Sequence, residues 1–169
     1  MTISMHQASA PRFARLLRNL SAILAKAQAH AEAKKLDAAA LTGDRLFPDM
    51  FPLTRQVQIA CDQAKGAVAR LAGIEPPKHE DVEQSFADLQ ARIARTLEFV
   101  ESIKADRIDG AEGREVVLKQ RAGELRLKGL DYLFSHAYPN FYFHVTTAYN
   151  ILRHNGVELG KKDFVGSFS

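Results

Sequence analysis

The chain has 169 residues, of which 46% are hydrophobic and 25% are charged, and it contains a single cysteine, Cys61. This length suits one domain with a buried core, and we expect a single domain over residues 1–169. One cysteine excludes an internal disulfide, no apolar run reaches the ~20 residues of a bilayer span, and residues 1–6 lack the pattern of a secretion signal. We therefore expect a cytoplasmic protein that has no membrane partner.

The formal net charge is +3, but charges of opposite sign are segregated along the chain. Residues 1–35 hold six Lys or Arg and one acid, whereas residues 75–112 hold five Lys or Arg and ten acids. Nucleic-acid-binding proteins usually concentrate basic residues on one face and carry a recognisable reading motif. The observed distribution is more typical of solvated helix faces, and we expect no nucleic-acid partner.

Apolar residues recur at helical spacing in four segments, and each segment predicts an amphipathic helix. In chain order, the four stripes run from Phe13 to Ala31, from Leu53 to Leu71, from Phe86 to Val100 and from Phe141 to Leu152. Local signals mark some of the ends. Asp81, three residues before Gln84, predicts the start of the third helix. Pro139 predicts the first turn of the fourth helix, and Gly156 predicts its end.

The segment between the third and fourth helices has a different pattern of apolar and charged residues. Residues 115–119 and 124–128 flank the sequence Gln120-Arg121-Ala122-Gly123, and apolar residues alternate with charged residues in the second of them. Two short segments around a glycine-containing turn, one of them alternating, predict a short β-hairpin.

The lengths of the connections constrain the topology. About ten residues join the second and third helices, which favours antiparallel neighbours, whereas residues 36–51 and 105–138 are long enough to run the length of a bundle. We therefore expect an all-α fold, a four-helix bundle with two crossover connections plus a short β-hairpin between helices 3 and 4. The apolar sequence RLFPDMFP in the first of these connections predicts a segment packed across the bundle.

No phosphate-binding loop, nucleophile elbow or paired-cysteine motif is present, so the candidate chemistry rests on single residues. Cys61 lies on the apolar stripe of the second helix, where a small buried side chain is the favoured interpretation over a catalytic thiol. Gln58, Asp62 and Lys65 share a neighbouring face of that helix. They either line a polar pocket or, as is more common for an Asp–Lys pair at this spacing, form a surface ion pair.

His144 is the other candidate, at the edge of the apolar stripe of the fourth helix. A pair of helical histidines that binds one metal ion needs a spacing of three or four residues, and none of the six histidines has such a mate. The favoured interpretation is a half-buried histidine hydrogen-bonded to Asn140 or to a group on the second helix. The alternatives are a small-molecule pocket that uses His144 as an acid, base or hydrogen-bond donor, and a metal site.

Aromatic residues are concentrated near the start of the fourth helix. Phe141, Tyr142 and Phe143 are consecutive, so they cannot all point into one core. At least one of them must face another element or a second subunit. This supports a homodimer as the expected assembly.

Three stretches of the chain resemble a bacterial family of domains of unknown function placed in the DinB/YfiT-like superfamily of proposed metalloenzymes. They are RLFPDMFPLTRQVQIACDQAKGAVARLAGIEPP, SFADLQARIARTLEFV and PNFYFHVTTAYNILRHNGVELGKKDFVG. The resemblance implies a four-helix bundle. It also implies a divalent-metal site of three histidines, one on the second helix and an H-x-x-x-H pair on the fourth. That pair falls on Asn140 and His144, and the second helix has no histidine, with Gln56, Gln58 or Asp62 as the nearest polar residues.

From these observations we expect a DinB-like binding or stress-associated accessory protein with a degenerate metal site, no cofactor and no catalytic activity. Its pocket would hold Asn140, His144, Tyr149, Gln58 and Asp62, with a small-molecule ligand. The alternative is a small-molecule enzyme of the thiol-transferase or hydrolase type. In that enzyme His144 would be the general base in a pocket between helices 2 and 4, oriented by Asn140 or Asp62, with a weakly held divalent metal as an option.

Overall fold

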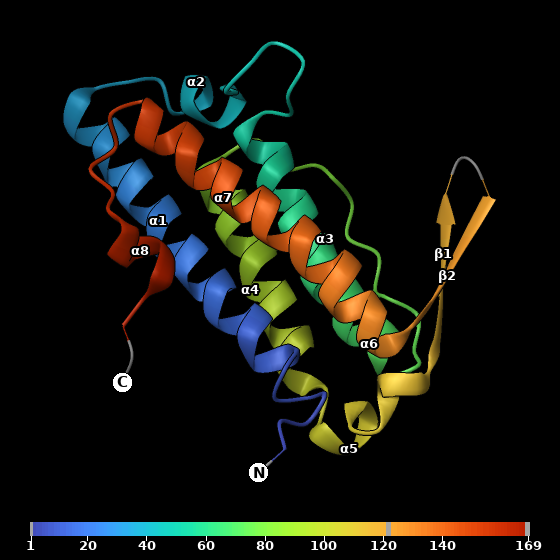
Figure 1. The fold of residues 1–169 in the computed structure, drawn as a ribbon. Coiled ribbons are helices and arrows are strands. Elements are labelled where there is room, and N and C mark those ends of the chain that lie inside the picture. Colours follow the sequence, from blue (N-terminus) through green and yellow to red (C-terminus); the bar gives the residue numbers. More distant parts are fainter. Residues whose placement is uncertain (1, 121–122, 168–169) are drawn as a thin grey trace.

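Four long helices bury their apolar stripes against one another in the computed structural model, which describes residues 2–120 and 123–167 (Figure 1). They are α1 (Ala10–Lys34), α3 (Leu53–Leu71), α4 (Phe86–Ser102) and α7 (Tyr138–His154). The shorter elements are α2 (Ala38–Gly43), α5 (Ala105–Ile108), η1 (Ala111–Gly113), β1 (Glu115–Gln120), β2 (Gly123–Lys128), α6 (Gly129–Asp131), η2 (Tyr132–Ala137) and α8 (Lys161–Val165). None of the helices in the described ranges is long and apolar enough to cross a bilayer.

The predicted four-helix bundle and the predicted hairpin are both confirmed. Strands β1 and β2 pair antiparallel, with Leu118 opposite Leu125, and the buried Val116 and Leu118 attach the hairpin to the core. The hairpin projects from one end of the bundle (Figure 1). Two of the predicted turn residues, Arg121 and Ala122, lie outside the described residues.

The consecutive aromatic residues of α7 divide between the core and the surface. Phe141 is buried against Phe13 of α1, with the two ring centroids 4.9 Å apart, whereas the side chains of Tyr142 and Phe143 are exposed. This agrees with the helical geometry that predicts that they cannot share one core. The homodimer inferred from it stays a prediction.

The connection that crosses the bundle is not one of those predicted to cross it. Contacts show that α3 and α4 run parallel, because Asp62 near the middle of α3 contacts Arg92 near the middle of α4 and the two helices also end side by side. By contrast, α3 and α7 run antiparallel, with Gln56 against His144 at one end and Arg70 against Tyr132 at the other. The prediction that the second and third helices are antiparallel neighbours is therefore wrong.

Residues 72–85 are the segment that crosses the bundle, and they return the chain from the end of α3 to the start of α4 (Figure 1). Extended chain covers about 3.3 Å per residue, so this segment can span roughly 45 Å, more than the roughly 26 Å of a 17-residue helix such as α4. The longer connections, 36–51 and 105–138, each stay at one end of the bundle, so their prediction as crossovers is wrong. Phe47 and Phe51 of the first one are 63% and 54% exposed rather than packed across the bundle.

A buried ion network fixes this crossing segment to the helices. Arg92 of α4 is fully buried, and its guanidinium donates to the carbonyl oxygen of Glu80 at 3.0 Å and to the carboxylate of Glu83 at 3.1 Å. Its other terminal nitrogen contacts Asp62 at 2.9 Å and Asp81 at 3.0 Å. One arginine therefore joins α3, α4 and the crossing segment.

Two predictions about this region are corrected by the network. Asp81 does not start the third helix, because its carboxylate faces Arg92, and α4 begins instead with a capping box formed by Ser85 and Asp88. Lys65 is not a surface residue, because its side chain is only 8% exposed where it contacts Asp62 at 2.8 Å. The crossing segment covers the face of α3 that would otherwise be solvated.

Pro139 lies in the first turn of α7, as predicted, but α7 also continues the helical path of α6 and η2. The backbone stays right-handed and helical at the junctions Asp131, Tyr132, Ala137 and Tyr138, and η2 is a π-helical segment. A proline inside an α-helix removes one hydrogen bond and clashes with the carbonyl four residues earlier. The wider π-helical turn before Pro139 relieves this clash, which explains how the helix passes through a proline.

We expect Arg92→Met to destabilise the fold strongly. Removing one partner of a buried ion pair leaves the carboxylate of Glu83 uncompensated, which costs about 3–5 kcal/mol. The measurement is the free energy of unfolding in denaturant. Arg95→Met is the matched control, because Arg95 also contacts Glu83, at 3.6 Å, but its side chain is 55% exposed. Equal losses in the two variants would contradict the role assigned to Arg92.

Candidate functional site

His144 lies at the edge of the buried face of α7 and contacts α3. Its Nδ1 atom is 2.7 Å from the Oε1 atom of Gln56, a residue only 1% exposed near the start of α3. The apolar neighbours of His144 on α7, among them Phe141 and Val145, turn into the core and hold the helix against α3. This arrangement agrees with the prediction of a half-buried histidine hydrogen-bonded to a group on the second helix.

The orientation of Gln56 fixes the tautomer of His144. The Nε2 atom of Gln56 donates to the carbonyl oxygen of Phe51 at 3.0 Å, and a carbonyl can only accept. The Oε1 atom of the same amide therefore faces His144 as an acceptor, so the imidazole donates from Nδ1. In a neutral imidazole this leaves Nε2 as a hydrogen-bond acceptor.

The surroundings of His144 favour its neutral form. Burial lowers the pKa of His144, and the positive charge of Arg55 lowers it further. Arg55 is itself held by Asp81 of the crossing segment and by the side-chain oxygen of Gln58 at 3.1 Å. The buried ion network thus fixes the cation that acts on His144.

One exposed aromatic side chain, Phe143, lies beside His144, and a second, Phe51, lies beside Arg55. Phe143 is 56% exposed, and its ring meets that of His144 edge-on, with centroids 5.2 Å apart. Phe51 is 54% exposed, and the guanidinium of Arg55 lies 5.9 Å from the centre of its ring. The imidazole of His144 thus has one exposed ring at its edge, and the nearby cation has another.

The other predicted pocket residues have different neighbours. Asn140 donates to the carbonyl oxygen of His136 at 2.7 Å, one turn back on its own helical path. Tyr149 packs against Phe164 of α8, with ring centroids 6.1 Å apart. Gln58 and Asp62 belong to the buried ion network. The contacts that the structure gives these four residues do not join them to His144.

The residues that sequence reasoning missed are Arg92, Arg55 and Phe51. Arg92 follows Leu89 at helical spacing and precedes Ile93, so its position on the apolar stripe of α4 was a signal of a buried cation. The sequence indicates Gln56 only as a stand-in for a metal ligand. Nothing in the sequence pattern shows which of the polar residues of α3 would face His144.

Cys61 is fully buried, as predicted for a small core side chain. Burial raises the pKa of its thiol to about 12, against a hydrogen bond to Thr96 that lowers it. A thiol that stays protonated and inaccessible is a poor nucleophile.

The donor groups at the site do not fit a divalent metal ion. The superfamily pattern asks for three imidazoles, and here a carboxamide on α3 and the carboxamide of Asn140 accompany the single imidazole of His144. Gln56 already occupies Nδ1 of that imidazole, and amide oxygens without a carboxylate are weak ligands for transition metals. In the described part of the chain, no group of three or more His, Cys, Asp or Glu side chains is arranged to hold a metal.

Comparison with known proteins agrees with the helical fold and with the resemblance seen in the sequence. The model of a family described as a domain of unknown function, DUF1993, matches residues 5–165. The chain belongs to the DUF1993 family. Its fold is also similar to the crystal structure of a DinB family member protein from Shewanella denitrificans, with a TM-score of 0.89 and 45% identity over 96% of this chain and 92% of that chain. No curated protein matches this DUF1993 protein.

The tautomer and the pKa of His144 can be measured together by NMR. We expect the imidazole of this DUF1993 protein to carry its proton on Nδ1 at about pH 7 and to titrate below the ordinary histidine value of about 6.5. The unfolded chain then binds that proton more tightly, so this group lowers the free energy of unfolding as the pH falls below about 6.5. Gln56→Leu removes the acceptor and should abolish the tautomer preference. A proton on Nε2 in the wild type would contradict the assigned hydrogen bond.

Proposed function

We propose that this DUF1993 protein is a metal-independent binding protein for small molecules, with neutral His144 as its recognition group. The observation that carries the proposal is the 2.7 Å hydrogen bond between His144 and Gln56. It places a carboxamide against the imidazole nitrogen in a fold whose relatives are proposed metalloenzymes. Gln56 orients the imidazole and needs no metal ion to do so.

The groups around His144 define the class of ligand. The unprotonated Nε2 atom accepts a hydrogen bond, so the ligand has to offer a hydroxyl or N–H group. The exposed rings of Phe51 and Phe143 offer apolar faces for a flat body, and stacking of this kind adds to the hydrogen bond. A phenol-like molecule combines these two properties.

Binding is favoured over acid–base catalysis because of the charges near His144. A histidine base is normally supported by a carboxylate that stabilises the imidazolium formed during the reaction. Here the hydrogen-bond partner is the neutral amide of Gln56, and the charge that lowers the pKa of His144 is the guanidinium of Arg55. Both features disfavour proton uptake by His144.

Phenol is a suitable probe of this site. We expect phenol, in the presence of a metal chelator, to shift the NMR signals of the His144 and Phe143 rings. Toluene lacks the hydroxyl group, and we expect it to bind about tenfold more weakly, the equivalent of one hydrogen bond of about 1.4 kcal/mol. His144→Leu should weaken phenol binding to the level of toluene. His154→Leu, at an exposed histidine of the same helix, is the matched control. Phenol binding that requires a metal, or that survives His144→Leu, would refute the proposal.

A second experiment tests the relation of Gln56 and Asn140 to a metal site. The double variant Gln56→His/Asn140→His places imidazoles at both positions beside His144, and three imidazoles are a common Zn²⁺ ligand set. We expect the variant to bind Zn²⁺ at least about tenfold more tightly than the wild type in isothermal titration calorimetry.

The control for this experiment is Gln58→His/Asn140→His, which adds the same number of imidazoles. Gln58 donates to Glu83 at 2.9 Å, within the ion network, so its replacement should not complete a site at His144. Equal Zn²⁺ affinities of the two double variants would refute the assigned position of Gln56. A stoichiometric transition metal in the purified wild-type protein would refute metal independence.

A further inference from the structure

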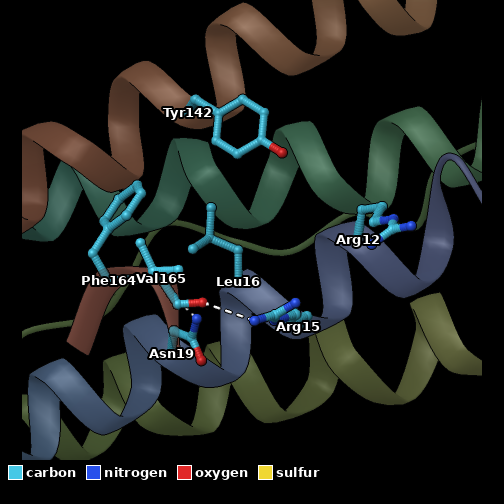
Figure 2. Close-up of a pocket in the computed structure, with 7 residues that line it drawn as sticks. All are labelled: Arg12, Arg15, Leu16, Asn19, Tyr142, Phe164 and Val165. Atoms are coloured by element: carbon cyan, nitrogen blue, oxygen red, sulfur yellow. Dashed lines mark hydrogen bonds between the residues drawn. The ribbon is translucent and has the colours of Figure 1, made fainter. Parts of the chain in front are cut away.

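A separate cavity of about 240 Å³ lies between α1, α7 and α8 (Figure 2). Its apolar walls come from Leu16, Tyr142, Phe164 and Val165, and its polar lining comes from Arg12, Arg15 and Asn19. The polar residues lie on α1 at intervals of three and four, from Arg12 through Arg15 to Asn19, so they share one face of that helix. The cavity is therefore a built feature of one helix face and the segment packed on it.

The cavity carries positive charge and no acidic side chain. The Arg15 guanidinium is positioned by the chain itself, because it donates to the carbonyl oxygens of Val165 at 3.1 Å and Ser167 at 3.2 Å. The Arg12 guanidinium is exposed, and among the described residues it has no hydrogen-bond or ion-pair partner. In contrast, the neighbouring Arg18 on α1 is paired with Glu101.

The polar groups of the cavity are held in place by α8. Asn19 donates from its side-chain nitrogen to the carbonyl oxygen of Phe164 at 2.9 Å, and Lys26 contacts Asp163 at 2.6 Å. Tyr149 packs on the ring of Phe164 from the α7 side. These contacts fix the aromatic wall relative to the two arginines before any ligand arrives, which lowers the cost of ordering on binding.

We propose that this cavity binds a small aromatic carboxylate, with the carboxylate at Arg12 and the ring between Tyr142, Phe164 and Leu16. Guanidinium groups pair with carboxylates through charge-assisted hydrogen bonds, and the phenol of Tyr142 adds a donor at the same rim. The volume is below the range of roughly 300–1,000 Å³ of drug-sized pockets, so the ligand is limited to about one ring and its acid group.

This site is independent of the one at His144. Tyr142 and His144 are two residues apart on α7, which places them on opposite sides of the helix. Tyr142 lines the cavity with Leu16 of α1, whereas His144 contacts Gln56 of α3. The carboxylate site can therefore exist whether or not the His144 site binds a ligand.

Benzoate is the probe for the experiment, and the methyl NMR signals of Leu16 and Val165 are the reporters. We expect saturable shifts of these signals with benzoate at concentrations up to about 50 mM, and binding of the neutral analogue benzamide at least about tenfold weaker. Arg12→Gln should weaken benzoate binding at least about tenfold, because it removes the cation and keeps a polar, unbranched side chain. Arg18→Gln is the matched control, since it removes an exposed arginine of α1 that does not line the cavity.

Several outcomes would overturn the proposal. Arg12 also lines a neighbouring cavity with Leu130 and Phe134, so benzoate shifts confined to the methyl groups of Leu130 would place binding there instead. Equal affinities for benzoate and benzamide would show that the positive charge is not used. Equal losses in Arg12→Gln and Arg18→Gln would indicate a general effect of net charge, and no shift of Leu16 or Val165 would exclude the site.

Discussion

The fold depends on one buried arginine that holds an extended segment across a helical bundle. Residues 75–84 form no backbone–backbone hydrogen bond with the described part of the chain, so side chains and solvent are the partners of their backbone groups. Arg92 supplies one directly, through the carbonyl oxygen of Glu80, and anchors the segment again at Glu83 and Asp81. The side chain of Arg92 thus gives this extended segment a hydrogen bond of the kind that a neighbouring strand would supply in a sheet.

The same network determines where the helices lie. An extended return segment allows α3 and α4 to run parallel, and α7 then packs antiparallel to α3 with its middle against the start of α3. Buried ion pairs often contribute little net stability, because desolvation of the charges offsets their attraction. In this protein their contacts attach one path of the crossing segment to α3 and α4. Asp81 also holds Arg55, so the path of the segment sets the charge beside His144.

The sequence was sufficient for the helices, the hairpin and the edge position of His144, because these follow from local periodicity and turn chemistry. The sequence was insufficient where the burial of a residue depends on a second element that packs over it. Lys65 shows a surface pattern on its own helix and becomes buried only because the crossing segment covers it. Asp81 has the sequence context of a helix cap, yet its carboxylate contacts Arg92 and Ser85 caps α4 instead.

Topology was the least predictable level for a related reason. The length of a connection sets only an upper limit on the distance it can span. Residues 72–85 are the shortest of the three connections between the long helices, yet they are long enough to cross the bundle. The pair Pro76-Pro77 disfavours helix and suits extended backbone, but does not state where that backbone lies. The candidate site was unpredictable for the same reason. Which of Gln56, Gln58 and Asp62 lies next to His144 is known only once the path of the chain through the bundle is known.

The Gln56–His144 pair can be compared with the outer hydrogen bonds of a metal site. In such sites, the nitrogen of a ligating histidine that does not bind the metal donates to a nearby oxygen, which fixes the tautomer and the orientation of the ring. Gln56 provides this same orientation from Oε1 and is itself fixed by the carbonyl group of Phe51. The carboxamide of Gln56 on α3 therefore holds His144 in one orientation without a metal ion. An oriented, neutral imidazole with one free acceptor is what a binding site needs, and the bundle keeps it in place by packing alone.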